Sequence, residues 1–366
     1  MTTTVADLTQ QLVAIPSHRE GDHDERAAGD FVASWLRDHT DAAVRRDEVG
    51  NVVARKGAGP SLALVGHHDV VPPDDSQVTA DGDYVVQRRD GRLYGRGTAD
   101  MKGCVAAAML AFAEADPAGE LVFASFVGEE QGGIGCRAAI EAGFAPDYAV
   151  VGEGSTGYSA AGVTDVAVAH KGRRGSTIVA EGAAAHASEP DAGENAVYRA
   201  CDAVDIVRDL SFPETEVLGH SLSGSVAVTE IDGGSAWNVV PERCTATVDE
   251  RTVPGERAPL SRVETVEGVS LRVDQDLPPM ACGDAAFAET VRSAAAAAQD
   301  GTPEQVVKPH ATDAGWLADA GTECVVVGAA EPGEAHTADE SVSIEVLERC
   351  REIYERVAET WPAAEN

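Results

Sequence analysis

Histidine and acidic residues occur along this chain in small groups that adjoin short apolar runs. The groups are, in chain order, His67-His68-Asp69 after Leu62–Val65, Asp100 before Met101–Ala115, Glu129-Glu130 after Leu121–Val127, Glu153 after Ala149–Val151, and His336 after Cys324–Val327. Imidazole nitrogens and carboxylate oxygens together form the mixed ligand set that suits zinc and similar divalent metals. The chemistry that they would support is metal-assisted hydrolysis.

The elements that must position these groups alternate between strands and helices. Most of the apolar runs are predicted strands, and helical patterns cover 3–14, 24–38, 101–115 and about 341–359. This alternation predicts an α/β fold with a mixed, mostly parallel sheet flanked by helices. The groups would meet at the carboxyl ends of the strands, where one carboxylate bridging two ions makes a two-metal centre with ions about 3.5–4 Å apart. Taken singly, each group also has a structural explanation, such as a helix cap at Asp100.

The middle of the chain has a different pattern. Alternating polar and apolar stretches lie at Ser176–Glu181, Ser225–Ile231 and Cys244–Arg251, with a helical pattern at Asn195–Leu210. These features predict a smaller α+β unit. Because strands of the first kind resume after it, we expect a discontinuous catalytic domain of 1–165 and 277–366 that carries an inserted lid domain of 166–276.

The composition restricts the classes of partner and compartment. The 366 residues carry a formal net charge of −34, and only four of the 28 basic residues are lysines. Such a chain should repel nucleic acid and anionic membranes, and it is typical of a cytoplasmic protein working in molar salt, where charge repulsion is screened. No apolar run approaches the roughly 20 residues of a membrane helix. The N-terminus lacks the pattern of a secretory signal. Seven scattered cysteines without a CxxC pair favour a reducing compartment.

Several longer motifs resemble one enzyme family. They are Gly66–Pro72 (GHHDVVP), Leu93–Gly103 (LYGRGTADMKG), Gly128-Glu129-Glu130 and Gly152-Glu153. In combination they are similar to the dizinc deacylases and exopeptidases, which include acetylornithine deacetylase, succinyl-diaminopimelate desuccinylase, aminoacylases and glutamate-releasing carboxypeptidases. The resemblance covers nearly the whole chain and implies a metal-dependent exopeptidase-like fold with an inserted dimerisation domain.

The resemblance implies a role for each member of the predicted centre. His67, Asp100 and Glu153 would hold one divalent ion, and the bridging Asp100 with Glu130 and His336 would hold the other. Asp69 would orient the ring of His67, and Glu129 would be the general base. Zinc fits these ligands, and cobalt or manganese could also serve.

The inserted domain also carries matching motifs. By resemblance, His186 in Ala185–Pro190 would reach the partner's centre in a homodimer and stabilise the oxyanion. Asn238 and Arg251 would hold the substrate's α-carboxylate, and Thr312 lies in a predicted substrate loop, 309–315. We expect His68 to be a partly exposed neighbour of the centre rather than a ligand, while His310 could contact substrate or be structural.

The resemblance implies a cytoplasmic hydrolase that cleaves the amide of an N-acyl amino acid. Succinyl-diaminopimelate desuccinylase and acetylornithine deacetylase are the leading expectations, and a dipeptidase or glutamate-releasing carboxypeptidase is the alternative. The chain lacks the Trp and Pro-Phe segment frequent in the desuccinylases, and its loop at 309–315 is closer to the deacetylases. A non-catalytic metal-binding protein is disfavoured because the general-base position, Glu129, is filled.

Overall fold

A computed structural model describes residues 3–19 and 24–361 of the chain, which forms two compact units. Unit 1 comprises Met1–Ala169, Met280–Lys308 and Thr312–Asn366, and unit 2 comprises His170–Pro279 and Pro309–Ala311. Unit 2 thus begins and ends a few residues later than the lid domain expected at 166–276. The reason at its start is that β8 (Val166–His170) pairs with β19 (Glu323–Val326) in the sheet of unit 1.

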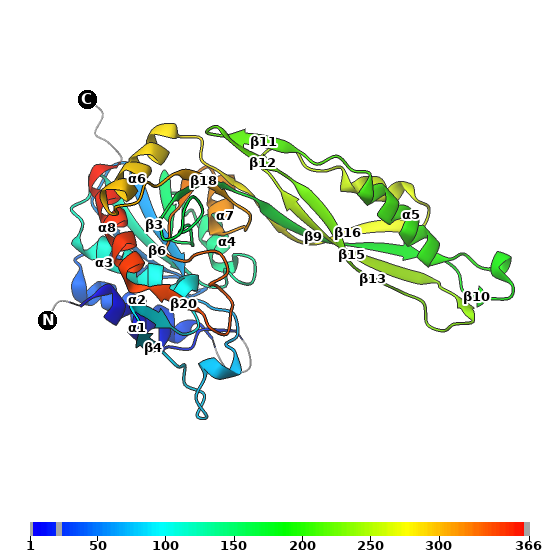
Figure 1. Ribbon diagram of the computed structural model, residues 1–366, viewed down its shortest axis with the longest axis horizontal. Helices are drawn as coiled ribbons and strands as arrows, with labels where there is room; N and C mark the ends of the chain where they lie inside the picture. Colours follow the sequence, from blue (N-terminus) through cyan, green and yellow to red (C-terminus); the bar gives the residue numbers. More distant parts are fainter. Residues whose placement is uncertain (1–2, 20–23, 362–366) are drawn as a thin grey trace. The chain divides into compact units, whose positions relative to one another are not determined.

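Unit 1 is built on a mixed sheet whose central strands are parallel (Figure 1). Its strands, in spatial order, are β1 (Ala43–Arg46), β2 (Val52–Lys56), β6 (Glu120–Phe126), β3 (Ser61–His67), β7 (Tyr148–Val151), β19, β8 and β17 (Met280–Ala281), with β18 (Gln305–Lys308) paired to β8. Strands β6, β3, β7 and β19 run parallel, whereas β1, β2 and β8 pair antiparallel with their neighbours. The prediction of a mixed, mostly parallel α/β sheet is therefore confirmed.

Helices cover both faces of this sheet. They are α1 (Val5–Val13), α2 (Arg26–His39), α3 (Gly103–Glu114), α4 (Ile134–Glu141), α6 (Ala285–Ala297), α7 (Asp313–Asp319) and α8 (Ile344–Thr360). Helix α3 packs on β3 and β6 and against α8, while α4 and α7 pack together on the other face. Helix α3 is rich in alanine and buried almost throughout, so its backbone lies close to the sheet. The helices predicted at 3–14, 24–38 and 101–115 begin and end within two residues of α1, α2 and α3, and the helix predicted at about 341–359 begins three residues before α8, which Ser343 caps.

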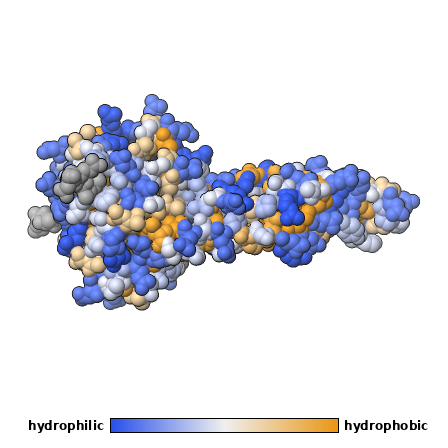
Figure 2. All heavy atoms as spheres, turned by 90° about the horizontal axis from the view of Figure 1, so that it is seen from above, coloured by the Kyte–Doolittle hydropathy of each residue, from blue (hydrophilic) through white to orange (hydrophobic). Residues whose placement is uncertain are grey.

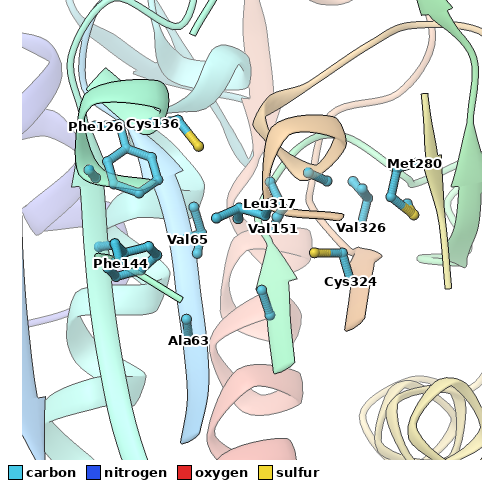
Figure 3. Packing of buried hydrophobic residues seen from close by; sticks show 14 of the residues in the cluster. Ala63, Val65, Phe126, Cys136, Phe144, Val151, Met280, Leu317, Cys324 and Val326 are labelled. Atoms are coloured by element: carbon cyan, nitrogen blue, oxygen red, sulfur yellow. The ribbon is translucent and has the colours of Figure 1, made fainter. Parts of the chain in front are cut away.

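The core between the sheet and helices α4 and α7 is closely packed (Figure 3). Val65 and Val151 project from neighbouring strands toward Leu317 of α7. The rings of Phe126 and Phe144 meet edge to face, with centroids 5.5 Å apart. All seven residues of β3 are buried, as expected for a central parallel strand covered on both sides. The last residue of this rigid strand is His67, so the core fixes the position of a predicted metal ligand.

Short elements lie beside the carboxyl ends of the central strands. Strands β4 (Gln87–Arg89), β5 (Arg92–Tyr94) and β20 (Ser341–Ser343) form a small antiparallel sheet, and short helices cover Asp75–Gln77 and Thr98–Lys102. In this sheet Ser341 pairs with Tyr94 and Ser343 with Arg92. The pairing joins the segment after His336 to the segment before Asp100, although these segments are far apart in the sequence.

Unit 2 has an antiparallel sheet with one helix packed on it (Figure 1). The sheet order is β13 (Ser225–Gly233), β15 (Arg243–Thr252), β9 (Gly172–Glu181) and β16 (Val269–Leu277). The other elements are α5 (Ala196–Arg208), the pair β10 (Ala185–His186) and β14 (Val239–Val240), the hairpin β11 (Glu214–Val217) and β12 (His220–Ser223), and short helices at Pro190–Ala192 and Leu260–Thr265. Residues of β15 alternate between exposed or half-buried and buried positions, which gives the sheet one apolar face for α5.

The surface agrees with the acidic composition. In the face shown in Figure 2, hydrophilic side chains predominate and hydrophobic ones are confined to a few patches. Among the described residues, no helix combines the length and the apolar character that crossing a membrane requires. All seven cysteines lie within the described residues and are free thiols.

Candidate metal centre

Three neighbouring parallel strands bring the predicted ligands to one edge of the sheet. His67 ends β3 opposite Phe126, the last residue of β6. Glu129 and Glu130 follow β6, and Glu153 follows β7, which is the other neighbour of β3. Parallel strands end at the same edge, so residues that are distant in the sequence converge there.

Glycines permit the sharp turns that separate these strands from their acidic residues. Gly128 precedes Glu129 with φ at +61°, a left-handed conformation that costs a side chain energy. Gly152 precedes Glu153, and a Cβ placed on it would lie 2.8 Å from Cε of Met101 and 3.1 Å from Cβ of Cys104. The strand–glycine–acid pattern of the sequence therefore has a steric cause at both positions.

Asp100 lies between the two predicted histidine ligands. Its Oδ1 is 3.1 Å from Nε2 of His67, and its Oδ2 is 3.1 Å from Nε2 of His336. Burial alone would raise the pKa of Asp100, but hydrogen bonds from His336 and His67 hold it far below its usual range. An ionised carboxylate that offers one oxygen to each side has the form of a bridging ligand.

Each imidazole also faces a glutamate of its own. Nε2 of His67 is 3.3 Å from Oε1 of Glu153, and Nε2 of His336 is 2.8 Å from Oε1 of Glu130. Ligands at about 2.0–2.1 Å from a tetrahedral zinc ion lie about 3.3 Å from one another. These separations and the mixed nitrogen and oxygen donors fit two divalent ions that share Asp100.

The carboxylates produce a strongly negative field at the two imidazoles. Burial would lower the pKa of His67, but hydrogen bonds to Asp100 and Asp69 raise it well above the usual value. Hydrogen bonds to Asp100 and Glu130 raise the pKa of His336 to about 10. The field that favours a proton on each ring equally favours a divalent cation in its place.

Asp69 connects the two halves of the centre. Its Oδ1 lies 3.3 Å from Nδ1 of His67, as the orienting role requires. The structure adds a second role, because the Asp69 carboxylate also accepts the backbone N–H groups of Glu129 and Glu130, each at 3.1 Å. Burial would raise the pKa of Asp69, but the contacts with His67 and these N–H groups lower it. The buried carboxylate of Asp69 therefore positions both the ring of His67 and the turn that carries Glu129 and Glu130.

Glu129 lies on the side of the centre occupied by His67 and Glu153, with ligand atoms of the three within 4.8 Å of one another. Burial raises the pKa of Glu129 well above its usual value, and the charge of His67 opposes this. A carboxylate with a raised pKa binds a proton more readily than an ordinary one, as a general base must. The geometry alone also permits Glu129 to be a ligand.

His68 differs from the expectation of a partly exposed neighbour. It is fully buried, and its Nδ1 pairs with Oγ of Ser125 at 2.9 Å. Burial lowers its pKa to about 3, so the ring is neutral. The alternation of side chains along an extended strand sends His68 to the opposite side from His67. His310 lies in the short segment that groups with unit 2, and its role stays open.

His186 and Asn238 are neighbours in unit 2. His186 in β10 pairs with Val239 in β14, and the N–H of Ala187 donates to the carbonyl of Asn238 at 2.9 Å. The His186 side chain is exposed, and its Nδ1 accepts the N–H of Ser188 at 3.2 Å. Nδ1 also pairs with Oγ of Ser188 at 2.6 Å, so both of these contacts use the same ring nitrogen.

Arg251 and Thr312 lie in different units. Arg251 is in β15 of unit 2, where its Nε donates to Oδ1 of Asp249 at 2.7 Å and its Nη2 donates to Oδ2 at 3.3 Å. Thr312 is in unit 1, buried at the start of α7, where its hydroxyl accepts the N–H of Ala314. Neither arrangement is evident from the sequence.

Several charged residues around the centre have no recognisable signal in the sequence. Arg96 and Glu340 form a buried ion pair next to the Asp100 segment. Burial lowers the pKa of Lys308 and raises that of Asp313 to about 7, and both groups interact electrostatically with Glu153. No periodicity or spacing distinguishes these residues from other charged residues, so only their burial identifies them.

Curated relatives match nearly the whole chain. The sequence is 30% identical over 390 residues to a succinyl-diaminopimelate desuccinylase of Stenotrophomonas maltophilia, with 97% of this chain and 98% of that protein covered. It is 32% identical over 355 residues to an acetylornithine deacetylase of Myxococcus xanthus, with 90% and 88% covered.

Solved structures show the same fold. The aminopeptidase PepT from Bacillus cereus superposes with a TM-score of 0.77 at 18% identity, covering 97% of each chain. The YXEP protein of Bacillus subtilis, described as a dinuclear metal-binding peptidase, superposes with a TM-score of 0.70 at 15% identity, covering 97% of this chain and 96% of that one. The sequence profile of peptidase family M20/M25/M40 matches residues 63–360. The chain therefore belongs to peptidase family M20/M25/M40 and is a metal-dependent hydrolase of amide bonds.

Proposed function

We propose that this protein removes the acyl group from the nitrogen of an amino acid or diamino acid with a free carboxylate. The observation that carries the proposal is Asp100, whose two oxygens each face one histidine of the centre. N-Succinyl-diaminopimelate and N-acetylornithine are the leading substrates, since the two relatives bear the names of enzymes for them. The enzyme would then serve lysine or arginine synthesis in the cytoplasm, where free thiols persist. The alternative is a dipeptidase or glutamate-releasing carboxypeptidase, since peptidases share the fold.

Two divalent ions fit the centre. His67 and Glu153 would hold one ion together with Asp100. His336 and Glu130 would hold the other, again with Asp100. Zinc matches the donors best, and cobalt or manganese are alternatives. When bound, the ions supply Lewis acidity, which polarises the scissile carbonyl and lowers the pKa of water.

Glu129 takes a proton from the attacking water and returns it to the departing amine nitrogen. Its carboxyl group lies beside His67 and Glu153, and the hydrogen bond from its backbone N–H to Asp69 fixes its backbone. Burial raises the pKa of Glu129, which makes the carboxylate a better proton acceptor than an exposed glutamate. The residue thus acts first as a base and then as an acid.

Three further residues are assigned to substrate binding. Asn238 and Arg251 hold the α-carboxylate, and Thr312 contributes a hydroxyl group. Asp249 accepts two of the five N–H donors of Arg251, which leaves the others for a second carboxylate. A homodimer brings His186 to the partner's centre, where Nε2–H stabilises the oxyanion.

Replacing His186 with alanine is expected to lower kcat by about 10²-fold or more, because one oxyanion donor is lost. Mixing this variant with Glu129→Ala protomers should create one intact centre in each mixed dimer. A random 1:1 mixture should then recover up to about a quarter of wild-type activity. The matched control is His220→Ala, which removes a half-buried histidine of β12 and should retain activity. Verified mixed dimers without any recovery would exclude action across the dimer.

The proposed substrate class is tested by amine release from the purified protein in molar KCl with Zn²⁺ or Co²⁺. N-Succinyl-diaminopimelate, N-acetylornithine and a dipeptide are compared, each with a chelator control. Chelator-sensitive cleavage of an N-acyl amino acid with kcat/KM of about 10⁴ M⁻¹s⁻¹ or more supports the proposal. Cleavage of the dipeptide alone would favour the peptidase alternative.

A further inference from the structure

Glu340 is the acceptor for a cluster of backbone N–H groups that precede the bridging carboxylate. Its Oε1 accepts the N–H groups of Gly97 at 2.9 Å, Ala99 at 3.0 Å and Asp100 at 3.2 Å. Its Oε2 pairs with the guanidinium of Arg96. The Glu340 side chain thus binds four of the five residues from Arg96 to Asp100, and the fifth, Thr98, donates to the carbonyl of Gly95 instead.

This pair is removed from solvent. The side chain of Glu340 has no exposed surface, and that of Arg96 is 4% exposed. Burying two charges is costly unless their hydrogen-bonding groups find partners. Here the glutamate accepts hydrogen bonds from backbone N–H groups of a turn, and these groups have no partner in a helix or a strand pair. The ion pair therefore fixes the local backbone conformation.

Glu340 also belongs to the segment that carries the other half of the centre. His336 lies four positions earlier, and the N–H of Glu340 donates to the carbonyl of Thr337 at 3.3 Å. The same carbonyl accepts Nε2 of Gln77 at 3.1 Å. The carbonyl of Glu340 accepts the N–H of Gly95 at 3.0 Å, where the pairing of β20 with β5 begins. The segments that carry Asp100 and His336 are therefore joined to each other by several hydrogen bonds.

The backbone of His336 needs such support. Its φ is +61°, in the left-handed region that few residues other than glycine adopt, although histidine adopts it more often than most. A strained conformation persists at a functional site only when the surrounding structure over-determines it. The contacts of Thr337 and Glu340 act directly after His336 and supply that restraint.

We propose that Glu340 is a positioning residue that holds Asp100 and His336 at the separation required to share a divalent cation. The inference rests on the proposed metal centre, and it adds a residue outside the ligand set. Glu340 is not one of the residues in the two candidate groups of metal ligands. It acts through three N–H groups on the bridging ligand's segment and through its own place in the His336 segment.

The test measures Co²⁺ binding to the metal-free enzyme by absorbance, together with activity at limiting and excess Co²⁺. Glu340→Ala is expected to lower the affinity for one of the two Co²⁺ ions by about 10- to 100-fold, which is the usual effect of losing a group that orients a metal ligand. Activity should fall at limiting Co²⁺ and recover in part at excess Co²⁺. Glu340→Gln should be intermediate, because its amide oxygen can still accept the N–H groups but the charge facing Arg96 is lost.

The matched control is Glu323→Ala in the same unit. Oε2 of Glu323 accepts the N–H groups of Gly283 at 2.7 Å and Asp284 at 3.1 Å, at the amino end of β19 and thus at the opposite sheet edge. This variant should lower the melting temperature of the metal-free protein without changing Co²⁺ affinity.

Two results would overturn the inference. Wild-type Co²⁺ affinity and kcat in a folded Glu340→Ala variant would show that the residue positions nothing at the centre. If Glu340→Ala does not fold, the Glu340→Gln variant is measured instead. Wild-type kcat and unchanged Co²⁺ affinity at both sites in Glu340→Gln would then exclude the positioning role. A wild-type protein that binds fewer than two Co²⁺ ions would instead refute the proposed metal centre, so the two failures are distinguishable.

Discussion

Replacing Glu129 with alanine is expected to lower kcat by about 10²- to 10⁴-fold while two divalent ions remain bound. The variant loses the group that moves the proton from water to the leaving amine. It retains Asp100, and it retains the hydrogen bond from the backbone N–H of residue 129 to Asp69, which shapes the turn after β6. Steady-state kinetics and the metal content of the dialysed protein measure the two effects separately.

The metal content decides between two roles for Glu129. Its carboxylate lies close enough to His67 and Glu153 to be a ligand as well as a base. Loss of one ion, with activity restored by excess metal, would identify a ligand and contradict the proposed proton transfer. Glu141→Ala, at the exposed end of α4, is the control and should retain both activity and metal.

Replacing Asp100 with alanine is expected to abolish high-affinity binding of both ions and to lower kcat by about 10³-fold or more. The estimate corresponds to losing several kcal/mol of Lewis-acid stabilisation, at 1.36 kcal/mol for each factor of ten. Both histidines depend on this one carboxylate, since each of its oxygens is 3.1 Å from one Nε2 atom. Calorimetric titration of the metal-free variant with Zn²⁺ measures the number and affinity of the sites.

Asp100→Asn provides the graded comparison. It keeps the size of the side chain and one oxygen, so we expect it to retain more affinity for one ion than for the other. Asp116→Ala, just beyond the other end of α3, controls for removal of an acidic group from an exposed position. One intact site and one lost site in Asp100→Ala would show that Asp100 is a terminal ligand and not a bridge.

Much of the centre follows from local rules that the sequence displays. Leu62–Val65, Leu121–Val127 and Ala149–Val151 are apolar enough to be central strands, and each leads to a turn followed by histidine or acid. Parallel strands end at one edge, so convergence of His67, Glu130 and Glu153 required no knowledge of contacts. The family resemblance supplied the pairing of ligands with ions, which apolar patterns do not contain.

Other features depended on packing and could not be predicted. His68 is a polar residue next to a ligand, and nothing local shows that its ring is buried against Ser125. The guanidinium of Arg251 forms an ion pair with Asp249, because the two side chains lie on the same face of β15 at a spacing of two residues. In a chain with 62 acidic residues, composition cannot show which ones form such pairs.

The sequence by itself determined the α/β class, the inserted unit, and the ligand types at the carboxyl ends of the strands. These follow from hydrophobic periodicity and turn residues, which act over a few positions. Only the tertiary structure decided that Asp69 accepts the N–H groups of Glu129 and Glu130 as well as facing His67, and that Glu340 joins the Asp100 and His336 segments. Asp100 and Glu340 are 240 positions apart. Their contact depends on how the whole sheet and its helices pack, since no short-range interaction carries information over that distance.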